Sequence, residues 1–228
     1  MTVKLKLAEK LTHTVFTASQ ESFRLSSQKV IVTGHGIDTD LFKPTEKLQE
    51  KSTVLNILSV GRISRVKNYE TLIKAAKVLE EKGFSFEIHI IGEIPMEKDK
   101  DYGLLILNKI KEVNLIHNLI FMEGKVNHED LIPYYQDNDL FVHLSKTGSL
   151  DKSLLEAMAS GIKVLSSNDW SRNNLPSELV FKENDPIDLA NKIQNIPKTD
   201  FRTQLRNYVV KNHNLDNLIA KISSVIQK

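Results

Sequence analysis

The fold is decided by one stretch, Thr147-Gly148-Ser149-Leu150-Asp151-Lys152-Ser153-Leu154-Leu155-Glu156-Ala157-Met158-Ala159-Ser160-Gly161. It lies between two apolar runs, residues 140–144 and 162–165, so the pattern predicts a strand, a turn of small residues, a short helix and a second strand. Ser149 or Asp151 can cap the helix, and Gly161 suits its left-handed end. Such a βαβ unit presents a helix N-terminus at the carboxyl edge of a parallel sheet, where anionic groups bind.

The composition is that of an ordinary globular protein. The chain has 228 residues, with 31 basic and 29 acidic side chains and a net charge of +2, so nucleic acid is not an expected partner. It has no cysteine, which excludes disulfides, thiolate metal sites and cysteine nucleophiles. Neither a signal peptide nor a run of about 20 apolar residues is present. We therefore expect no transmembrane segment and a cytoplasmic location, with peripheral attachment to a membrane left open.

Strand and helix patterns alternate regularly from residue 54 onward. Apolar runs predict strands at residues 55–60, 86–91, 119–122, 140–144, 162–165 and 179–181. Amphipathic or polar segments predict helices at residues 68–82, 104–113, 129–136, 187–195, 201–211 and 215–226. Strands that alternate with helices indicate an α/β fold, so we expect a Rossmann-like, doubly wound parallel sheet.

The two ends of the chain fit this unit less well. Residues 1–33 predict a helix, a strand at 14–17, a helix from Ser19 and a strand at 29–33, which is too little to close a core alone. Residues 39–52 are polar and contain Pro44, which indicates a linker. The last helix has an apolar stripe that must pack on this domain or on something outside the chain: Leu215, Leu218, Ile219, Ile222 and Ile226.

The turn after the first strand of the sheet, Gly61 to Asn68, combines a glycine with cations just before a helix. Glycine lets the backbone approach a ligand, and Arg62 and Lys67 could bind a diphosphate through charge-assisted hydrogen bonds. A solvated basic loop is the alternative. Glu156 lies in the predicted helix among leucines and an alanine, where a carboxylate needs a partner because burying an unpaired charge is costly. A structural ion pair and a ligand contact are both compatible with that position.

Other motifs carry less weight. Gly34-His35-Gly36 lacks the third glycine of a dinucleotide fingerprint. The pairs Asp38/Asp40 and Asp137/Asp139 match a short metal motif, but roles in turns or caps explain them better. The seven histidines show no metal-ligand spacing. We therefore expect no metal site.

Taken together, these pieces resemble the retaining glycosyltransferases of family four, the "group 1" enzymes of GT-B fold. The similarity covers nearly everything from Lys29 onward, and the motifs occur in the family's order. They are Gly36-Ile37-Asp38-x-x-Leu41-Phe42-x-Pro44, Gly61-Arg62 with Lys67-Asn68, Gly124-Lys125-Val126 and Leu155-Glu156-Ala157-Met158-Ala159-x-Gly161.

The resemblance implies a nucleotide-diphosphate sugar as donor substrate, no cofactor and no metal. Arg62 and Lys67 would neutralise the leaving diphosphate beside Gly61, which makes them catalytic residues. Asp151 is the third candidate catalytic residue, as a replacement for a carboxylate of the family. Backbone at Gly124 and Val126 would contact the base, Glu156 the ribose hydroxyls, and the amides of Ser149, Leu150 and Asp151 the sugar or phosphate. The chain would thus be the C-terminal, donor-binding half of a GT-B glycosyltransferase.

Two departures from the family qualify this prediction. The family's first glutamate falls at Gly148, so either Asp151 takes its place or Asp151 only caps the helix. Most of the N-terminal acceptor domain is also missing. Residues 1–34 would be its remnant, 35–53 the linker and 54–228 the nucleotide-sugar-binding domain. An acceptor-domain partner chain, or a second copy bound through the last helix, would then complete the enzyme.

Two other functions stay open. The chain could be a non-catalytic nucleotide-sugar-binding module, an inactive and truncated relative of the enzymes. A metal-dependent transferase that uses Asp38 and Asp40 is the third alternative.

Overall fold

The computed structural model of the chain describes residues 3–23, 25–45, 53–94, 96–113, 118–124, 126–146, 150–196 and 199–227. Its centre is a five-stranded, wholly parallel sheet with the strand order β5-β4-β3-β6-β7. The strands are β3 (Leu55–Val60), β4 (Phe86–Gly92), β5 (Leu119–Glu123), β6 (Leu140–His143) and β7 (Lys163–Ser166). The chain first adds strands on one side of β3 and then returns to add β6 and β7 on the other. In open α/β sheets, ligands bind where the order reverses in this way, at the carboxyl ends of the two central strands.

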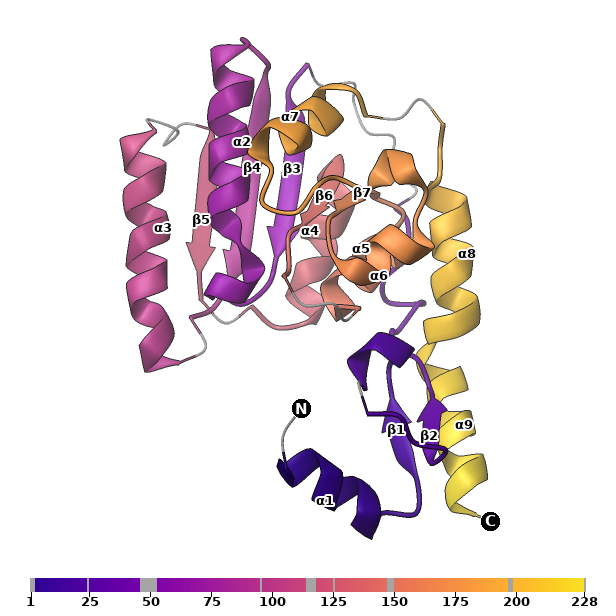
Figure 1. Cartoon of the computed structure of the whole chain (residues 1–228). Helices are drawn as coiled ribbons and strands as arrows, with labels where there is room; N and C mark the ends of the chain where they lie inside the picture. Colours follow the sequence, from indigo (N-terminus) through magenta and orange to yellow (C-terminus); the bar gives the residue numbers. More distant parts are fainter. Residues whose placement is uncertain are drawn as a thin grey trace.

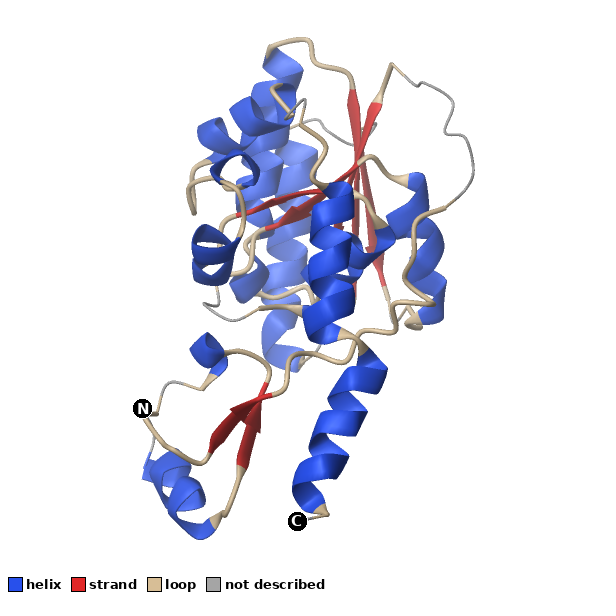
Figure 2. Ribbon diagram, turned by 90° about the vertical axis from the view of Figure 1, so that its right-hand side faces the viewer, coloured by secondary structure: helices blue, strands red, loops and turns tan. Residues whose placement is uncertain are grey.

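Helices cover both faces of this sheet (Figures 1 and 2). One face packs against α2 (Tyr69–Glu81), α3 (Lys100–Glu112) and α7 (Pro186–Gln194), and the other against α4 (Ile132–Asp137), α5 (Lys152–Ser160) and α8 (Arg202–His213). Neighbouring residues of β3 point to opposite cores, because Ile57 belongs to the first and Leu58 to the second. The expected α/β fold with a doubly wound parallel sheet is confirmed.

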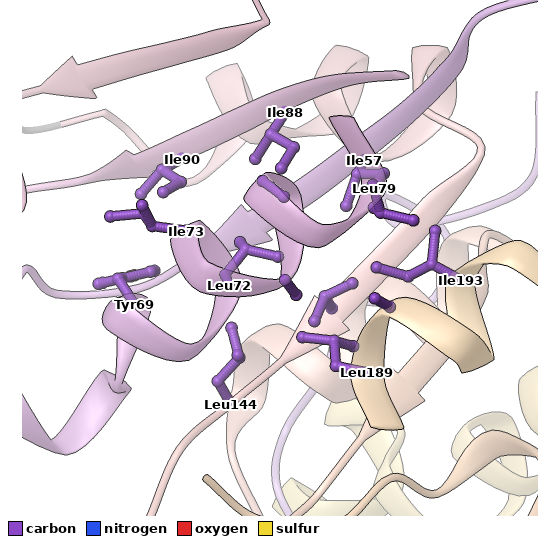
Figure 3. Close-up of a cluster of buried hydrophobic side chains, with 14 of the residues drawn as sticks. Ile57, Tyr69, Leu72, Ile73, Leu79, Ile88, Ile90, Leu144, Leu189 and Ile193 are labelled. Carbon is purple, nitrogen blue, oxygen red and sulfur yellow. The ribbon is translucent and has the colours of Figure 1, made fainter. Parts of the chain in front are cut away.

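The first core joins α2 to the sheet and to α7 (Figure 3). Leu72, Ile73 and Leu79 share one face of α2 and are fully buried against Ile57 and Ile88 of the strands. Each such side chain contributes about 1.5–3 kcal/mol by leaving water. Periodic apolar positions therefore fix how α2 lies on the sheet.

The second core includes part of the segment that the sequence assigned to a linker. Ile37 and Phe42 are buried among Tyr135, Phe141 and Leu155. Arg206 of α8 also donates hydrogen bonds to the carbonyls of Thr39 and Phe42 (3.1 and 2.9 Å). The beginning of residues 35–53 is therefore packed against the sheet domain, while residues 46–52 lie outside the described ranges.

Two local expectations are corrected. The helix expected from Ser19 is a single 3-10 turn, η1 (Gln20–Ser22), because serines in this segment bond locally and compete with a helix: Ser19 Oγ contacts Ser22 Oγ, and Ser27 Oγ accepts from the Lys29 amide. The strand expected at 179–181 is the 3-10 turn η5 (Ser177–Leu179) followed by one bridge, Val180 to Ser166.

The sequence did not predict α6 (Asp169–Asn174), which follows β7. Its N-terminus is capped by Asn168, whose side chain accepts from the Ser171 amide (2.9 Å). The remaining 3-10 turns are η2 (Arg65–Lys67), η3 (Glu97–Asp99) and η4 (Glu129–Leu131).

A smaller region lies beside the sheet domain. It contains α1 (Val3–Leu11) and a separate parallel pair, β1 (Val15–Thr17) with β2 (Val30–Val32). The last helix, α9 (Leu215–Ile226), leaves α8 at Asn214 and runs past β2 (Figure 1). Lys221 donates to the Val32 carbonyl there. In the part of the chain that is described, no helix combines the length and apolar character needed to cross a membrane.

The crossing between the two regions is tightly built. Ile37 makes two backbone hydrogen bonds with the segment between α8 and α9. Its N–H donates to the His213 carbonyl (2.8 Å), and its carbonyl accepts from the Leu215 N–H (3.0 Å). Gly34 has φ of 80°, and a Cβ there would lie 2.4 Å from the Asn212 carbonyl oxygen. Only glycine fits this approach.

Candidate functional site

An ion pair lies where the strand order reverses. Lys67, at the end of the turn after β3, and Asp151, just before α5, are 84 residues apart in sequence, yet Lys67 Nζ donates to Asp151 Oδ2 at 2.6 Å. His143, the last residue of β6, donates from Nε2 to the same oxygen at 2.8 Å. The fold thus brings two of the predicted catalytic residues, Lys67 and Asp151, into direct contact and adds a histidine.

Burial and neighbours set the charges of this cluster. Burial opposes ionisation of Asp151, but the hydrogen bond from His143 and the charge of Lys67 outweigh it and hold the pKa of Asp151 well below its usual range. Burial lowers the pKa of His143, and Lys67 lowers it further, against the opposing pull of Asp151. At neutral pH the cluster is an ammonium, a carboxylate and a neutral imidazole.

The structure decides against a purely capping role for Asp151. This residue occupies the N-cap position of α5 with extended dihedral angles (φ −94°, ψ 144°), yet its side chain makes no capping hydrogen bond. The carboxylate turns to Lys67 and His143 instead. The alternative that Asp151 only caps the helix is therefore wrong.

Four other predicted residues surround a hollow of about 200 Å³ at the carboxyl ends of β3, β4 and β5. Gly61 and Arg62 border it on one side and Gly124 and Val126 on the other, with Gly92 between them. A Cβ on Gly92 would stand 1.9 Å from the Gly61 carbonyl oxygen, so the two turns pass each other at a distance that only glycine permits. Arg62 is exposed at the rim.

Glu156 is buried in α5 and both of its carboxylate oxygens are hydrogen-bonded. Oε1 accepts from His128 Nε2 (2.8 Å) and Oε2 from the Tyr135 hydroxyl (3.0 Å). Burial raises the pKa of Tyr135 well above its usual range, and Glu156 raises it further, so the phenol stays a donor. The expected partner of the buried carboxylate is thus found. A carboxylate has about four acceptor positions, and side chains among the described residues fill two of them.

Leu150, another predicted residue, lies in the segment just before α5. Leu150 is buried, and its carbonyl contacts Nε2 of His35 at 2.8 Å. Ser149 and Gly148 lie outside the described residues, as does Lys125. His35 also donates its backbone N–H to Nδ1 of His213 (3.1 Å), so the crossing segment is bonded both to α8 and to this loop.

Sequence reasoning missed three histidines at this site: His35, His128 and His143. It tested histidines for metal-ligand spacing, whereas these three hold a carbonyl or a carboxylate. The available signal was position, because His143 is the one polar residue in the apolar run 140–144, near the predicted carboxyl edge of a strand.

Asp38 makes the expected turn contacts, whereas Asp139 bonds to the distant strand β3. Asp38 Oδ1 accepts from the amides of Asp40 (3.1 Å) and Leu41 (2.9 Å), and Asp139 Oδ2 accepts from the Asn56 amide (2.8 Å). Over the residues that the structure describes, no three histidine, aspartate or glutamate side chains are grouped as metal ligands.

Known proteins share this architecture. Anabaena HepE, solved in complex with UDP and glucose, superimposes with a TM-score of 0.83 at 16% identity over 99% of this chain and 66% of its own. Sucrose-phosphate synthase of Thermosynechococcus elongatus gives 0.83 at 21% identity, over 98% of this chain and 61% of its own. At these identities the likeness concerns the fold, which is that of the GT-B glycosyltransferases.

Sequence comparisons show which family the chain belongs to. The amylovoran biosynthesis glycosyltransferase AmsK of Erwinia amylovora is 29% identical over 149 residues, which are 62% of this chain and 34% of AmsK. Residues 42–215 match the family "Glycosyl transferases group 1". This chain therefore belongs to the glycosyl transferases group 1 family. It spans between about a quarter and a half of the length of the curated relatives it matches.

Proposed function

We propose that this chain binds the nucleotide-diphosphate sugar donor of a glycosyltransferase, of hexosyltransferase type, that transfers the sugar with retention of configuration. The observation that carries the proposal is the pairing of Lys67 with Asp151 where the strand order reverses (2.6 Å), in the same edge of the sheet as the hollow beside Arg62. Anions and nucleotides bind at such edges. HepE, which shares the fold, was solved with UDP and glucose.

In this proposal the chemistry rests on charge stabilisation. When the bond between sugar and diphosphate breaks, negative charge develops on the leaving oxygens, and preorganised cations lower the energy of that state. Arg62 and Lys67 are the cations, and Gly61 lines the hollow beside Arg62 without a side chain to block it. No metal or cofactor is assigned a role.

The other contacts follow from position. Gly124 and Val126 line the hollow that would hold the base, and the Glu156 carboxylate, oriented by His128 and Tyr135, would accept from the ribose hydroxyls. The backbone of Ser149, Leu150 and Asp151 would contact the sugar or phosphate. The Asp151 carboxylate would take the place of the family's first glutamate, which is Gly148 here.

An acceptor site requires more protein than this sheet domain. Catalysis needs the acceptor held against the donor with water excluded. We assign that task to further polypeptide, either continuous with residues 1–34 in a longer protein, or a partner chain, or a second copy bound through α9. The exposed apolar side chains of α1 and α9, such as Val3 (84%) and Ile226 (72%), support a covering partner.

A second candidate is a binding module without transfer activity. Gly148 in place of the family's carboxylate favours it. Such a module would bind the nucleotide sugar and would neither hydrolyse nor transfer the sugar, with or without a partner that carries an acceptor domain.

Calorimetric titration with UDP and with GDP, without added metal, tests the proposal. We expect one of the two to bind, and Glu156→Ala to weaken binding by about tenfold, as the loss of a charged hydrogen-bonding group implies. Glu81→Ala is the matched control, because Glu81 is an exposed carboxylate at the C-terminal end of α2. Failure of the folded wild-type chain to bind either nucleotide would overturn the proposal.

A further inference from the structure

His143 is a buried histidine whose two ring nitrogens are both hydrogen-bonded. It ends β6 and is only 2% exposed. Nε2 contacts Asp151 Oδ2 (2.8 Å), and Nδ1 contacts the Ser166 hydroxyl (3.0 Å). Ser166 is its register partner on β7, so the pairing of β6 with β7 holds the imidazole in place. The proposed chemistry assigns His143 no contact with the substrate.

The hydrogen-bond chain fixes the tautomer of His143. Asp151 is ionised and can only accept, so Nε2 carries the proton. In a neutral ring Nδ1 then accepts, and the Ser166 hydroxyl donates to it. Ser166 Oγ in turn accepts from the Ser171 hydroxyl at 2.7 Å, and Ser171 stands in the first turn of α6. All hydrogen bonds of this network therefore donate in one direction, from α6 through β7 and β6 to the Asp151 carboxylate.

Lys67 is the second donor to the Asp151 carboxylate. Its ammonium donates one of three N–H groups to the same Asp151 oxygen, and its side chain is 13% exposed. A lysine side chain has four flexible carbons and loses conformational entropy when it is held. An anchored carboxylate can hold the lysine before the ligand arrives, with the ammonium placed to donate its other N–H groups to phosphate oxygens.

We propose that His143 is a positioning residue of the diphosphate site: its Nε2–H anchors the Asp151 carboxylate, and the anchored carboxylate fixes the Lys67 ammonium. This inference rests on the proposed function, in which Lys67 binds the diphosphate. Without the imidazole, Asp151 would lose its hydrogen bond to the end of β6. The ion pair could then turn as a unit, and the carboxylate could follow the ammonium and compete with the phosphate for it.

The ratio of two affinities isolates this effect. Dissociation constants for UDP and for uridine are measured by calorimetry, or for GDP and guanosine if those bind, with wild type, His143→Leu, Lys67→Met and the double variant. The nucleoside lacks the diphosphate, so the ratio reports what Lys67 contributes. We expect His143→Leu to lower the preference for the diphosphate by about tenfold, and the double variant to show no further loss beyond Lys67→Met, as coupled residues do.

Conservative variants guard against misfolding. His143→Gln keeps an N–H that can reach Asp151 and should restore most of the ratio, whereas His143→Asn is too short and should not. His89→Leu is the matched control, since His89 is also a sheet histidine with both nitrogens bonded, to Asn138 (2.8 Å) and Glu87 (2.9 Å). It should leave the ratio unchanged.

The outcomes separate the two proposals. A wild-type chain that binds no nucleotide overturns both. Nucleotide binding with an unchanged ratio in His143→Leu overturns the role of His143 alone. Losses that add in the double variant, or equal ratios in the Gln and Asn variants, also overturn it, because they show that His143 acts through something other than Lys67.

Discussion

The sheet domain and the smaller region of α1, β1, β2 and α9 both have helices with an apolar stripe, but the stripe is buried in the first region and exposed in the second. In the sheet domain the stripe of α2 is fully buried, as Leu72 and Leu79 show. In the smaller region Leu7 of α1 is 58% exposed, and α9 has no buried residue. A two-stranded sheet is marginal by itself, and parallel strands normally have both faces covered. An apolar stripe thus shows that a helix needs a partner without showing that the partner is in the chain.

Truncating one leucine in each region tests whether burial really differs between them. Leu72→Ala leaves a cavity in the first core and should lower the free energy of unfolding by roughly 3–5 kcal/mol. Leu7→Ala, its matched control, removes a side chain that is already in water and should change it by less than about 0.5 kcal/mol. Urea unfolding followed by circular dichroism measures both. Equal losses would mean that the two regions share one core.

The crossing between the regions can be tested with two glycines. Gly34→Ala should cost roughly 2–3 kcal/mol, because it combines a positive φ with a Cβ 2.4 Å from the Asn212 carbonyl. Gly83 has φ of 66° and nothing within 4 Å of a built Cβ, so Gly83→Ala should cost only about 1 kcal/mol. Hydrogen exchange should show faster opening of residues 33–37 and 212–226 in the first variant only.

Acid should weaken the same crossing. Burial, and secondarily His35, lower the pKa of His213 to about 4 from an unfolded value of 6.5. Between these values the unfolded chain binds more protons, so stability is full above about pH 6.5 and falls as the pH drops toward 4. We expect this residue to account for roughly 2 kcal/mol of the loss. His213→Asn keeps an acceptor for the His35 amide, and its unfolding free energy should vary less with pH over this window.

Two helix caps give the smallest effect. The side chains of Asn168 and Asn214 accept from first-turn amides of α6 and α9, respectively. Replacing either with alanine should cost about 1 kcal/mol. Asn168→Ala should lower the urea midpoint of the whole chain, while Asn214→Ala should mainly speed exchange in α9. A global loss from Asn214→Ala would show that α9 is integral to the main core.

The fold was predictable because the sheet strands are mostly apolar runs, and β3, β4 and β5 each end at or next to a glycine. The sequence predicted all five strands of the main sheet, since strands buried on both faces need continuous apolar residues. The errors lie where tertiary context decides. Val180 and Phe181 have strand-like residues but pair with Ser166 at one bridge only, and α6 depends on the Asn168 cap within a polar segment.

The site was predictable in its parts and not in its connections. Arg62, Lys67, Asp151 and Glu156 were identified from local motifs and from the family resemblance. Their roles toward a ligand stay predictions. The contact between Lys67 and Asp151 could not be predicted from spacing, because it spans 84 residues and depends on the side-chain directions at two strand ends. The use of His143 as a donor to a carboxylate was missed for the same reason.

The short junction at Asn214 turns α9 into a lever. The helix has 12 residues and is therefore about 18 Å long, so a rotation of about 10° at its base moves its far end by roughly 3 Å. The hydrogen bond from His35 to Leu150 lies near the base of α9, next to the residues that enter α5. A partner that pushes on the tip of α9 would therefore apply torque close to Asp151.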